Sequence, residues 1–304
     1  MRRRFEFIAV WTILRAFGAL PRPIARLAGG AVGAVARWCL PRLSRVGLRN
    51  LELAFPEKTE AERRRILRRL YRNLGWQLAE FCLMARYTRE SARGFLRCDG
   101  LERYIAARDA GQGVLILTAH LGAWELSSFY HSLAGFPMSM VIRRLDNPLV
   151  DALVNRIRCM HGNRVLHKDD FARGLLSLMR EGGTVGILMD TNMTPPQGVF
   201  VDFFGIPACT PTGLAHVARK TGAAVLPGFV LWDSAEKKYV LRFGPEIEMP
   251  HTKDVSADIL AGTQRCTSEI ETWIRRAPDQ WLWVHRRWKT RPAGEPGLYG
   301  RRRA

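Results

Sequence analysis

From residue 95 onward the chain alternates between short apolar runs and longer amphipathic segments, and this alternation constrains the fold most. Apolar runs of about four to eight residues bounded by glycine predict buried strands, and longer segments with apolar residues three or four apart predict helices. The expected strands span residues 114–117, 138–143, 164–166, 185–189, 224–231 and 239–243. The expected helices span residues 101–109, 121–133, 148–160, 171–181, 212–221 and 255–276. Strands separated by helices predict an α/β fold with a mostly parallel sheet flanked by helices.

A histidine and a glutamate, His120 and Glu125, follow the first of these strands. The carboxyl end of a strand is where an open α/β sheet places its chemistry. Residues five apart diverge by roughly 140° on a regular helix, so the two side chains converge only if His120 lies in the turn before the helix. A neutral imidazole held by a carboxylate can accept a proton. The alternative is a histidine at a helix start beside a solvated glutamate.

Five sets of residues resemble, in order, those of a known family. They are an upstream Arg-Asn-Leu-Glu-Leu-Ala-Phe-Pro segment, the His/Glu pair, an arginine followed by Asn-Pro, an aspartate at a strand end with the segment after it, and a tryptophan-rich block. These lie at residues 49–56, 120–125, 141–151, 186–190 with 198–208, and 278–292. Together they resemble the lipid A biosynthesis (lauroyl/myristoyl) acyltransferases, within the lysophospholipid/glycerolipid acyltransferase superfamily. The resemblance covers about residues 45–292.

The resemblance implies a reaction and its partners. A fatty acyl chain would pass from acyl carrier protein or acyl-CoA to a hydroxyl of a lipid A precursor or a similar phosphorylated glycolipid. This would occur at the cytoplasmic face of the bacterial inner membrane, with His120 as general base and Glu125 as the carboxylate that orients it. No cofactor, metal ion or nucleic acid is expected. The chain departs from the family at Thr191, where glutamine is common, and this leaves the acceptor open.

The acceptor's phosphates need guanidinium partners, because the planar fork of arginine matches phosphate oxygens. By resemblance, Arg143 and Arg144 are the candidates, and Asn147 shapes their loop. Asp190 ends another apolar strand, so we expect it at the same edge of the sheet as His120. There it positions substrate or caps a turn.

The tryptophan-rich block contributes His285 and Arg286 to the expected substrate site. His285 is the second candidate for the base, because it has no carboxylate at a short fixed spacing. The alternation over residues 281–285 predicts a half-buried strand. Tryptophans beside arginines also suit a membrane interface.

The chain lacks the signatures of covalent catalysis. It has no Gly-x-Ser-x-Gly motif and no cysteine beside a histidine. Direct attack of the acceptor hydroxyl on the thioester is therefore the favoured route. The backbone amides of Leu121 and Gly122, at the expected helix start, would stabilise the oxyanion.

The N-terminal segments 5–20 and 24–40 are mostly apolar and are separated by Pro-Arg-Pro. Each carries charges, so neither predicts a membrane span of about 20 apolar residues, and no small-residue cleavage site indicates a signal peptide. Arg26 and Arg37 share one helix face, with Trp38 on the other. This predicts amphipathic helices in the membrane interface, with core-facing helices as the alternative. The expected parts are membrane-associated helices over 1–45, an acyltransferase domain over 46–292 and a loose basic tail over 293–304.

The formal charge of +19 over 304 residues calls for an anionic partner. No RNA-binding motif or zinc-finger spacing accompanies the arginines, which favours an anionic membrane surface and an acidic carrier protein over nucleic acid. Six arginines between residues 63 and 72 form one side of an expected helix. That side is a solvated face, a carrier-protein dock or a membrane-facing surface. The six scattered cysteines indicate reduced thiols in a protein facing the cytoplasm.

Three other functions fit parts of this pattern. An acyltransferase could act on a different acceptor, such as a phosphatidylinositol mannoside or a lysophospholipid. A thioesterase would use the same base to activate water, without an acceptor lipid. A non-catalytic basic protein that binds membranes or nucleic acid would not need His120.

Overall fold

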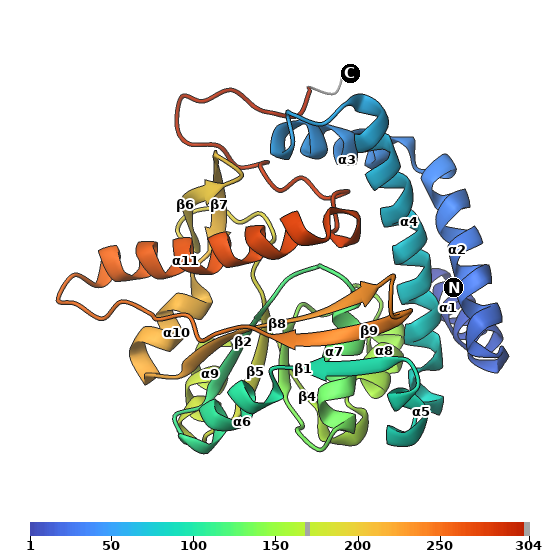
Figure 1. Ribbon diagram of the computed structural model, residues 1–304, viewed down its shortest axis with the longest axis horizontal. Coiled ribbons are helices and arrows are strands. Elements are labelled where there is room, and N and C mark those ends of the chain that lie inside the picture. The colour runs from blue at the N-terminus through green and yellow to red at the C-terminus, as the bar shows by residue number, and fades with distance from the viewer. Residues whose placement is uncertain (168–170, 301–304) are drawn as a thin grey trace.

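The computed structural model describes residues 1–167 and 171–300, and its centre is a seven-stranded sheet with helices on both faces (Figure 1). The strands are β1 (Leu96–Asp99), β2 (Val114–Thr118), β3 (Ser139–Ile142), β4 (Arg164–His167), β5 (Thr184–Leu188), β6 (Gly198–Phe203), β7 (Ile206–Pro211), β8 (Ala224–Asp233) and β9 (Lys238–Phe243). The helices are α1 (Arg2–Ala19), α2 (Arg22–Cys39), α3 (Pro41–Ala54), α4 (Glu60–Leu83), α5 (Arg89–Arg93), α6 (Leu101–Asp109), α7 (Trp124–Leu133), α8 (Pro148–Arg158), α9 (Phe171–Arg180), α10 (Gly213–Thr221) and α11 (Val255–Arg276). Short 3₁₀ turns are η1 (Met84–Arg86), η2 (Met160–Gly162) and η4 (Pro278–Gln280).

The strand order in the large sheet is β1-β9-β8-β2-β5-β3-β4. All neighbouring pairs are parallel except β8 and β9, which form an antiparallel pair. The predicted α/β class and mostly parallel sheet are therefore confirmed. Because β2, β5 and β3 are neighbours and run in one direction, the residues that follow them emerge at one edge of the sheet.

The alternation along β2 explains why its residues are apolar without interruption. Leu115 and Leu117 pack in a cluster with α9, α10 and α11, whereas Val114 and Ile116 pack in a second cluster with α6 and α7. A strand that is buried on both faces needs apolar side chains at successive positions. The core is thus two layers of side chains separated by the sheet.

Several elements differ from the sequence prediction. The strand β1 and the two-stranded antiparallel sheet of β6 and β7 were not predicted. The β6–β7 turn consists of Phe204 and Gly205, both with positive φ, as a tight two-residue hairpin requires. Only the glycine signals such a turn in the sequence. The helix predicted from residue 121 begins at Trp124, since the preceding residues form a loop.

Helix α2 packs along α4, and glycines allow the close approach. A Cβ atom at Gly29 or Gly33 would collide with the carbonyl oxygens of Gly75 and Tyr71, respectively. The two helix backbones are therefore in direct contact, an arrangement that side chains larger than hydrogen would prevent. Figure 1 shows α1 and α2 in a layer outside α4, beside the sheet domain.

A buried ion cluster holds the same helix pair. The fully buried Glu80 of α4 accepts hydrogen bonds from Arg22, at 2.7 Å, and from the Tyr87 hydroxyl, at 2.5 Å. Arg26 also contacts Glu80 and lies between the rings of Trp76 and Trp232. The prediction that Arg26 lies on the basic face of a helix in the membrane interface is therefore wrong, because Arg26 is buried and a carboxylate on α4 supplies its counter-charge.

The outer faces of α1 and α2 carry exposed apolar side chains. Leu27 is 77% exposed and Trp38 is 82% exposed. The other large apolar side chains exposed on these helices are Phe5, Ile8, Trp11, Ile13, Ile24, Val32 and Val35. Within the described residues, none of the helices is both long enough and apolar enough to cross a membrane.

The C-terminal block is buried and irregular. Trp281, Trp283 and Trp288 are completely buried, so the predicted tryptophan belt at a membrane interface is wrong. The predicted strand is reduced to one β-bridge between Leu121 and Trp281. The segment expected to be loose is held at Tyr299, whose hydroxyl donates to Asn50 and accepts from the Trp288 amide. The arginines after residue 300 lie outside the described residues.

Candidate active site

A histidine and an aspartate meet at the edge of the sheet where β2 and β5 end. The Nδ1 atom of His120 lies 2.9 Å from Oδ1 of Asp190, although the two residues are 70 positions apart. The backbone amide of His120 and the indole of Trp281 both donate to Oδ2 of Asp190, at 2.9 and 2.7 Å. Asp190 is fully buried, whereas the His120 side chain is 23% exposed.

This contact shifts both pKa values in the direction of an ion pair. Burial disfavours imidazolium, but the charge and hydrogen bond of Asp190 outweigh it, and the pKa of His120 lies above its usual value. Burial also opposes ionisation of Asp190. The positive charge and hydrogen bond of His120, together with the Trp281 hydrogen bond, nevertheless hold the pKa of Asp190 well below its usual range.

The pairing determines which ring nitrogen is available for chemistry. Because Asp190 is ionised, Nδ1 of the neutral ring carries the proton and donates it to the carboxylate. The lone pair is then on Nε2, which has no hydrogen-bond partner among the described residues. The edge of Trp124, with ring centroids 5.3 Å apart, limits rotation of the imidazole. His120 can therefore accept a proton at Nε2.

Glu125 is not the carboxylate that contacts His120. Both of its oxygens are bound by the guanidinium of Arg158, with Arg158 Nε 2.9 Å from Oε2. The negative charge of Glu125 also raises the pKa of His120, but less than the charge and the hydrogen bond of Asp190 do. The prediction that Glu125 orients the imidazole by contact is thus corrected to Asp190. The other half of that prediction is observed, since His120 does lie in the turn before α7.

The loop between β2 and α7 is fixed by its backbone. Gly122 has a φ of +65°, and a Cβ atom there would collide with the carbonyl oxygen of Val230. Its amide donates to the Gln280 carbonyl at 2.9 Å, and the Leu121 amide donates to Ala119 at 2.7 Å. The prediction that these two amides stabilise an oxyanion therefore does not fit this structure, because both already have acceptors.

His285 lies beside the pair. Its Nδ1 donates to the Leu282 carbonyl at 2.7 Å, while the Leu282 amide donates to the His120 carbonyl. Burial lowers the pKa of His285, although the charge of Asp190 partly opposes this shift. The ring is therefore neutral near pH 7, and its buried Nε2 has no partner among the described residues. Buried polar atoms without partners are uncommon in folded proteins.

The residues expected to bind phosphate lie further out. Arg143 and Arg144 are exposed in the loop after β3, where Arg143 pairs with Asp146 at 2.9 Å. Asn147 is buried and caps α8 through its contact with the Leu149 amide. Its amide group also donates to Glu6 and to the Arg3 carbonyl, which docks α1 on this loop.

The exposed Arg286 lies over Tyr299. Its neighbour Arg287 is fully buried and donates to the Cys209 carbonyl and the Thr210 hydroxyl. Burial lowers the pKa of Arg287 to about 10, while the charge of Asp190 partly opposes that shift. Arg287 was not among the residues predicted for the site. Alternation of buried positions from Trp281 onward was the available signal, since it puts residue 287 on the buried side.

Two asparagines that were not among the predicted site residues hold the C-terminal block in place. Asn50 donates to the backbone carbonyls of Trp283 and His285, both at 2.6 Å. Asn192 accepts from the Thr290 amide and donates to its hydroxyl. Asn50 lies in one of the segments of family resemblance, which was the only signal that could have indicated it.

The site has the geometry that general-base chemistry requires: a buried aspartate fixes an imidazole whose second nitrogen is uncommitted at the carboxyl edge of a parallel sheet. Among the side chains that the structure describes, no three from His, Cys, Asp or Glu are grouped to hold a metal ion. The sequence profile of the family described as "Bacterial lipid A biosynthesis acyltransferase" matches residues 1–290. The chain belongs to this family and is an acyltransferase.

Characterised relatives from Escherichia coli K12 span most of the chain. The lipid A biosynthesis palmitoleoyltransferase is 30% identical over 281 residues, which is 92% of this chain and 90% of that protein. The lauroyltransferase is 29% identical, covering 95% and 92% of the two chains. The myristoyltransferase is 26% identical, covering 85% and 79%. The family resemblance inferred from the sequence is thereby confirmed.

Proposed function

We propose that this protein transfers a fatty acyl chain from acyl carrier protein to a hydroxyl of a lipid A precursor, with His120 as general base. The observation that carries the proposal is the His120–Asp190 pair with Nε2 uncommitted, in a chain of the lipid A acyltransferase family. The names of the relatives support the acceptor class, since each acts in lipid A biosynthesis.

The reaction follows from this geometry. Nε2 of His120 takes the proton of the acceptor hydroxyl as its oxygen attacks the thioester carbonyl, and a carbon–oxygen bond forms in a tetrahedral intermediate. Asp190 stabilises the imidazolium that results, because it accepts the hydrogen bond from Nδ1. When the tetrahedral intermediate collapses, the carbon–sulfur bond breaks and the thiolate takes the proton from Nε2. Acyl group and proton are thus both transferred, and the histidine returns to its neutral form.

The remaining residues contribute binding in this proposal. Arg143 and Arg144 follow β3, whose neighbour is β5, and so they lie at the same sheet edge as His120. Their exposed guanidinium groups would bind the acceptor's phosphates. Glu125, held by Arg158, would stabilise the charge that develops on His120. His285 and Arg286 would contact substrate from the C-terminal block.

Attachment to the cytoplasmic face of the inner membrane is the last part of the proposal. The exposed apolar side chains of α1 and α2, including Leu27 and Trp38, support it. Apolar side chains that enter the interface, with basic residues at the headgroups, bind anionic bilayers without spanning them. Asn147 connects the loop after β3, which carries Arg143 and Arg144, to α1. This loop would therefore lie near the membrane that holds the acceptor.

Transfer of labelled lauroyl from acyl carrier protein to a tetra-acylated lipid A precursor tests the proposal. Membranes containing the wild type, His120→Ala, Asp190→Asn and Glu125→Gln are compared. We expect the wild type to transfer, and His120→Ala to lose at least about 10²-fold in rate, because general-base catalysis is removed. His251→Ala, which replaces an exposed histidine far along the chain, is the matched control and keeps full activity.

The same assay without acceptor lipid separates transfer from hydrolysis. Release of free fatty acid at the full rate would identify a thioesterase. Failure of the wild type to acylate the lipid A precursor, with acylation of another glycolipid, would refute the acceptor but not the chemistry. Unchanged activity in His120→Ala would refute the mechanism.

A further inference from the structure

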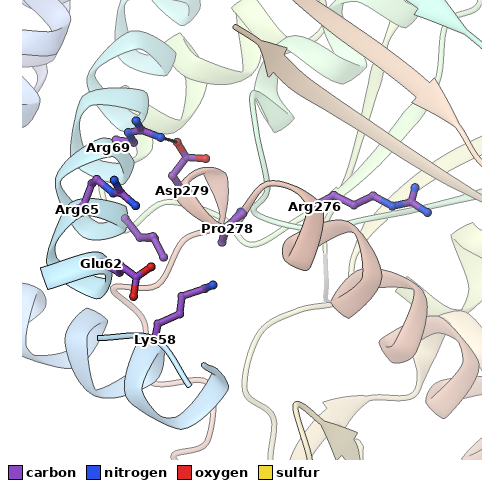
Figure 2. Close-up of a pocket in the computed structure, with 8 residues that line it drawn as sticks. Lys58, Glu62, Arg65, Arg69, Arg276, Pro278 and Asp279 are labelled. Carbon is purple, nitrogen blue, oxygen red and sulfur yellow. Dashed lines mark ion pairs between the residues drawn. The ribbon is translucent and has the colours of Figure 1, made fainter. Parts of the chain in front are cut away.

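A charged groove separates the first half of α4 from the end of α11 (Figure 2). Its volume is about 310 Å³, and it is lined by Lys58, Glu62, Arg65, Ile66, Arg69, Arg276, Pro278 and Asp279. In Figure 2 the side chains of Arg65 and Arg69 extend from α4 on one side, and Lys58 projects from the loop below them. Pro278 and Asp279 form the opposite wall.

The groove carries an excess of positive charge. Four of its lining residues are cationic and two are acidic. Glu62 is engaged in capping its own helix, where it accepts from the amide and hydroxyl of Thr59 at 2.8 Å. Asp279 reaches Arg69 only at 3.8 Å, and Arg65 forms no ion pair within the described part of the chain. Lys58 pairs with Glu57 at 3.7 Å, so among the described residues it is Arg65 and Arg276 that an anionic partner would find without an internal ion pair.

One wall of the groove continues into the catalytic segment. The Asp279 carbonyl accepts from Asn73 at 2.8 Å, which fixes this wall to α4. The next residue, Gln280, accepts from the amide of Gly122 in the loop that follows His120. Trp281 then donates to Asp190. A partner bound in the groove thus contacts the segment that positions the catalytic pair.

We propose that this groove is the docking surface for the acidic carrier protein that delivers the acyl thioester, an inference that rests on the function proposed above. Charge complementarity between the groove and an acidic protein surface steers association and fixes its orientation. A membrane fits this surface less well, because its apolar lining residues, Ile66 and Pro278, are buried or half-buried. The exposed apolar side chains that an interface-bound helix needs lie on α1 and α2 instead.

The test compares two donors in the full-length protein. Arg65→Gln/Arg69→Gln removes two groove cations, and Arg180→Gln/Lys220→Gln removes two exposed cations elsewhere. Steady-state rates are measured with lauroyl-acyl carrier protein and with lauroyl-CoA. For the groove variant we expect kcat/KM to fall by about tenfold with the carrier donor, through KM, and to stay within about twofold with lauroyl-CoA. The control variant keeps both values.

Direct binding makes the inference independent of catalysis. Fluorescence anisotropy of labelled holo-acyl carrier protein should show salt-sensitive binding to the wild type, weakened about tenfold in the groove variant. This measurement stands even if no acyl transfer is found, so failure of the proposed function is distinguishable from failure of the docking surface. Equal losses with both donors, or unchanged binding of the carrier protein, would overturn the proposal. Loss of binding to anionic vesicles in the groove variant, with carrier binding intact, would assign the groove to the membrane.

Discussion

The buried carboxylate of Asp190 determines how His120 titrates. It accepts from the His120 amide and from Trp281, so its orientation does not depend on the imidazole alone. The proton on Nδ1 is therefore held in place before a substrate arrives, and Nε2 needs no rearrangement to act.

The pH dependence of kcat/KM tests this arrangement. His120 must be neutral to act as a base, and its pKa is raised above the usual value, so activity should rise with pH through that raised pKa. Asp190→Asn removes the negative charge that raises the pKa of His120 against the effect of burial. We therefore expect the acidic limb of the pH–rate profile to move to lower pH, while the maximal rate falls. His285→Gln leaves the His120–Asp190 contact intact, so its acidic limb should stay at the pH of the wild type. A limb that does not move in Asp190→Asn would mean that another group titrates.

The pairing of Glu125 with Arg158 makes a separate prediction for stability. The two side chains are 24% and 17% exposed, so each loses part of its hydration and relies on the other. We expect Glu125→Gln or Arg158→Gln alone to lower the free energy of unfolding by about 2 kcal/mol, less than for a fully buried pair. The double variant should lose about as much as either single variant, because the same contact is removed. Additive losses in chemical denaturation would show that the pair is not coupled.

At the scale of elements, the contact between α2 and α4 depends on glycine. We expect Gly33→Ala to lower the free energy of unfolding by about 2 kcal/mol, because its methyl group would collide with the Tyr71 carbonyl and separate the helices. The control is Gly30→Ala in the same helix, where the nearest atom to a Cβ is Trp76 Nε1 at 3.4 Å. It should be neutral or stabilising by about 0.5–1 kcal/mol, since alanine favours helix. Equal effects of the two variants would contradict close packing here.

Elements were predictable where their pattern is local. The ranges of α6 and α11 follow the periodicity of apolar residues, and β2 and β8 follow continuous apolar runs. The β6–β7 hairpin was missed, because its turn requires positive φ at Phe204, a residue that gives no such signal. The C-terminal block was predicted as a strand, but its alternation instead reflects side chains that enter the core from an irregular segment.

At the scale of the whole molecule, the charge of +19 and the apolar face of α1 and α2 predict binding to anionic vesicles. We expect Leu27→Glu/Trp38→Glu to reduce binding by at least about tenfold, because two exposed apolar anchors are replaced by charges. Val255→Glu/Leu260→Glu changes two exposed apolar residues of α11 and is the matched control. Cosedimentation with vesicles measures the difference. Equal losses in both variants would indicate that charge alone drives binding.

The sequence by itself determined the α/β class, the placement of His120 at a strand end and the family. The first two depend on residue spacing along the chain, which directly encodes the period of a helix or a strand. The family was inferred from the resemblance of five residue blocks in order. Only the tertiary structure decided which carboxylate holds His120, because Asp190 is distant in sequence and becomes a neighbour only when β2 pairs with β5. The same holds for Arg26, whose buried partner Glu80 lies on another helix. Residue spacing does not show that α2 and α4 pack against each other. Partners of buried charges are chosen by which strands and helices become neighbours, and that choice is made by the packing of the whole core.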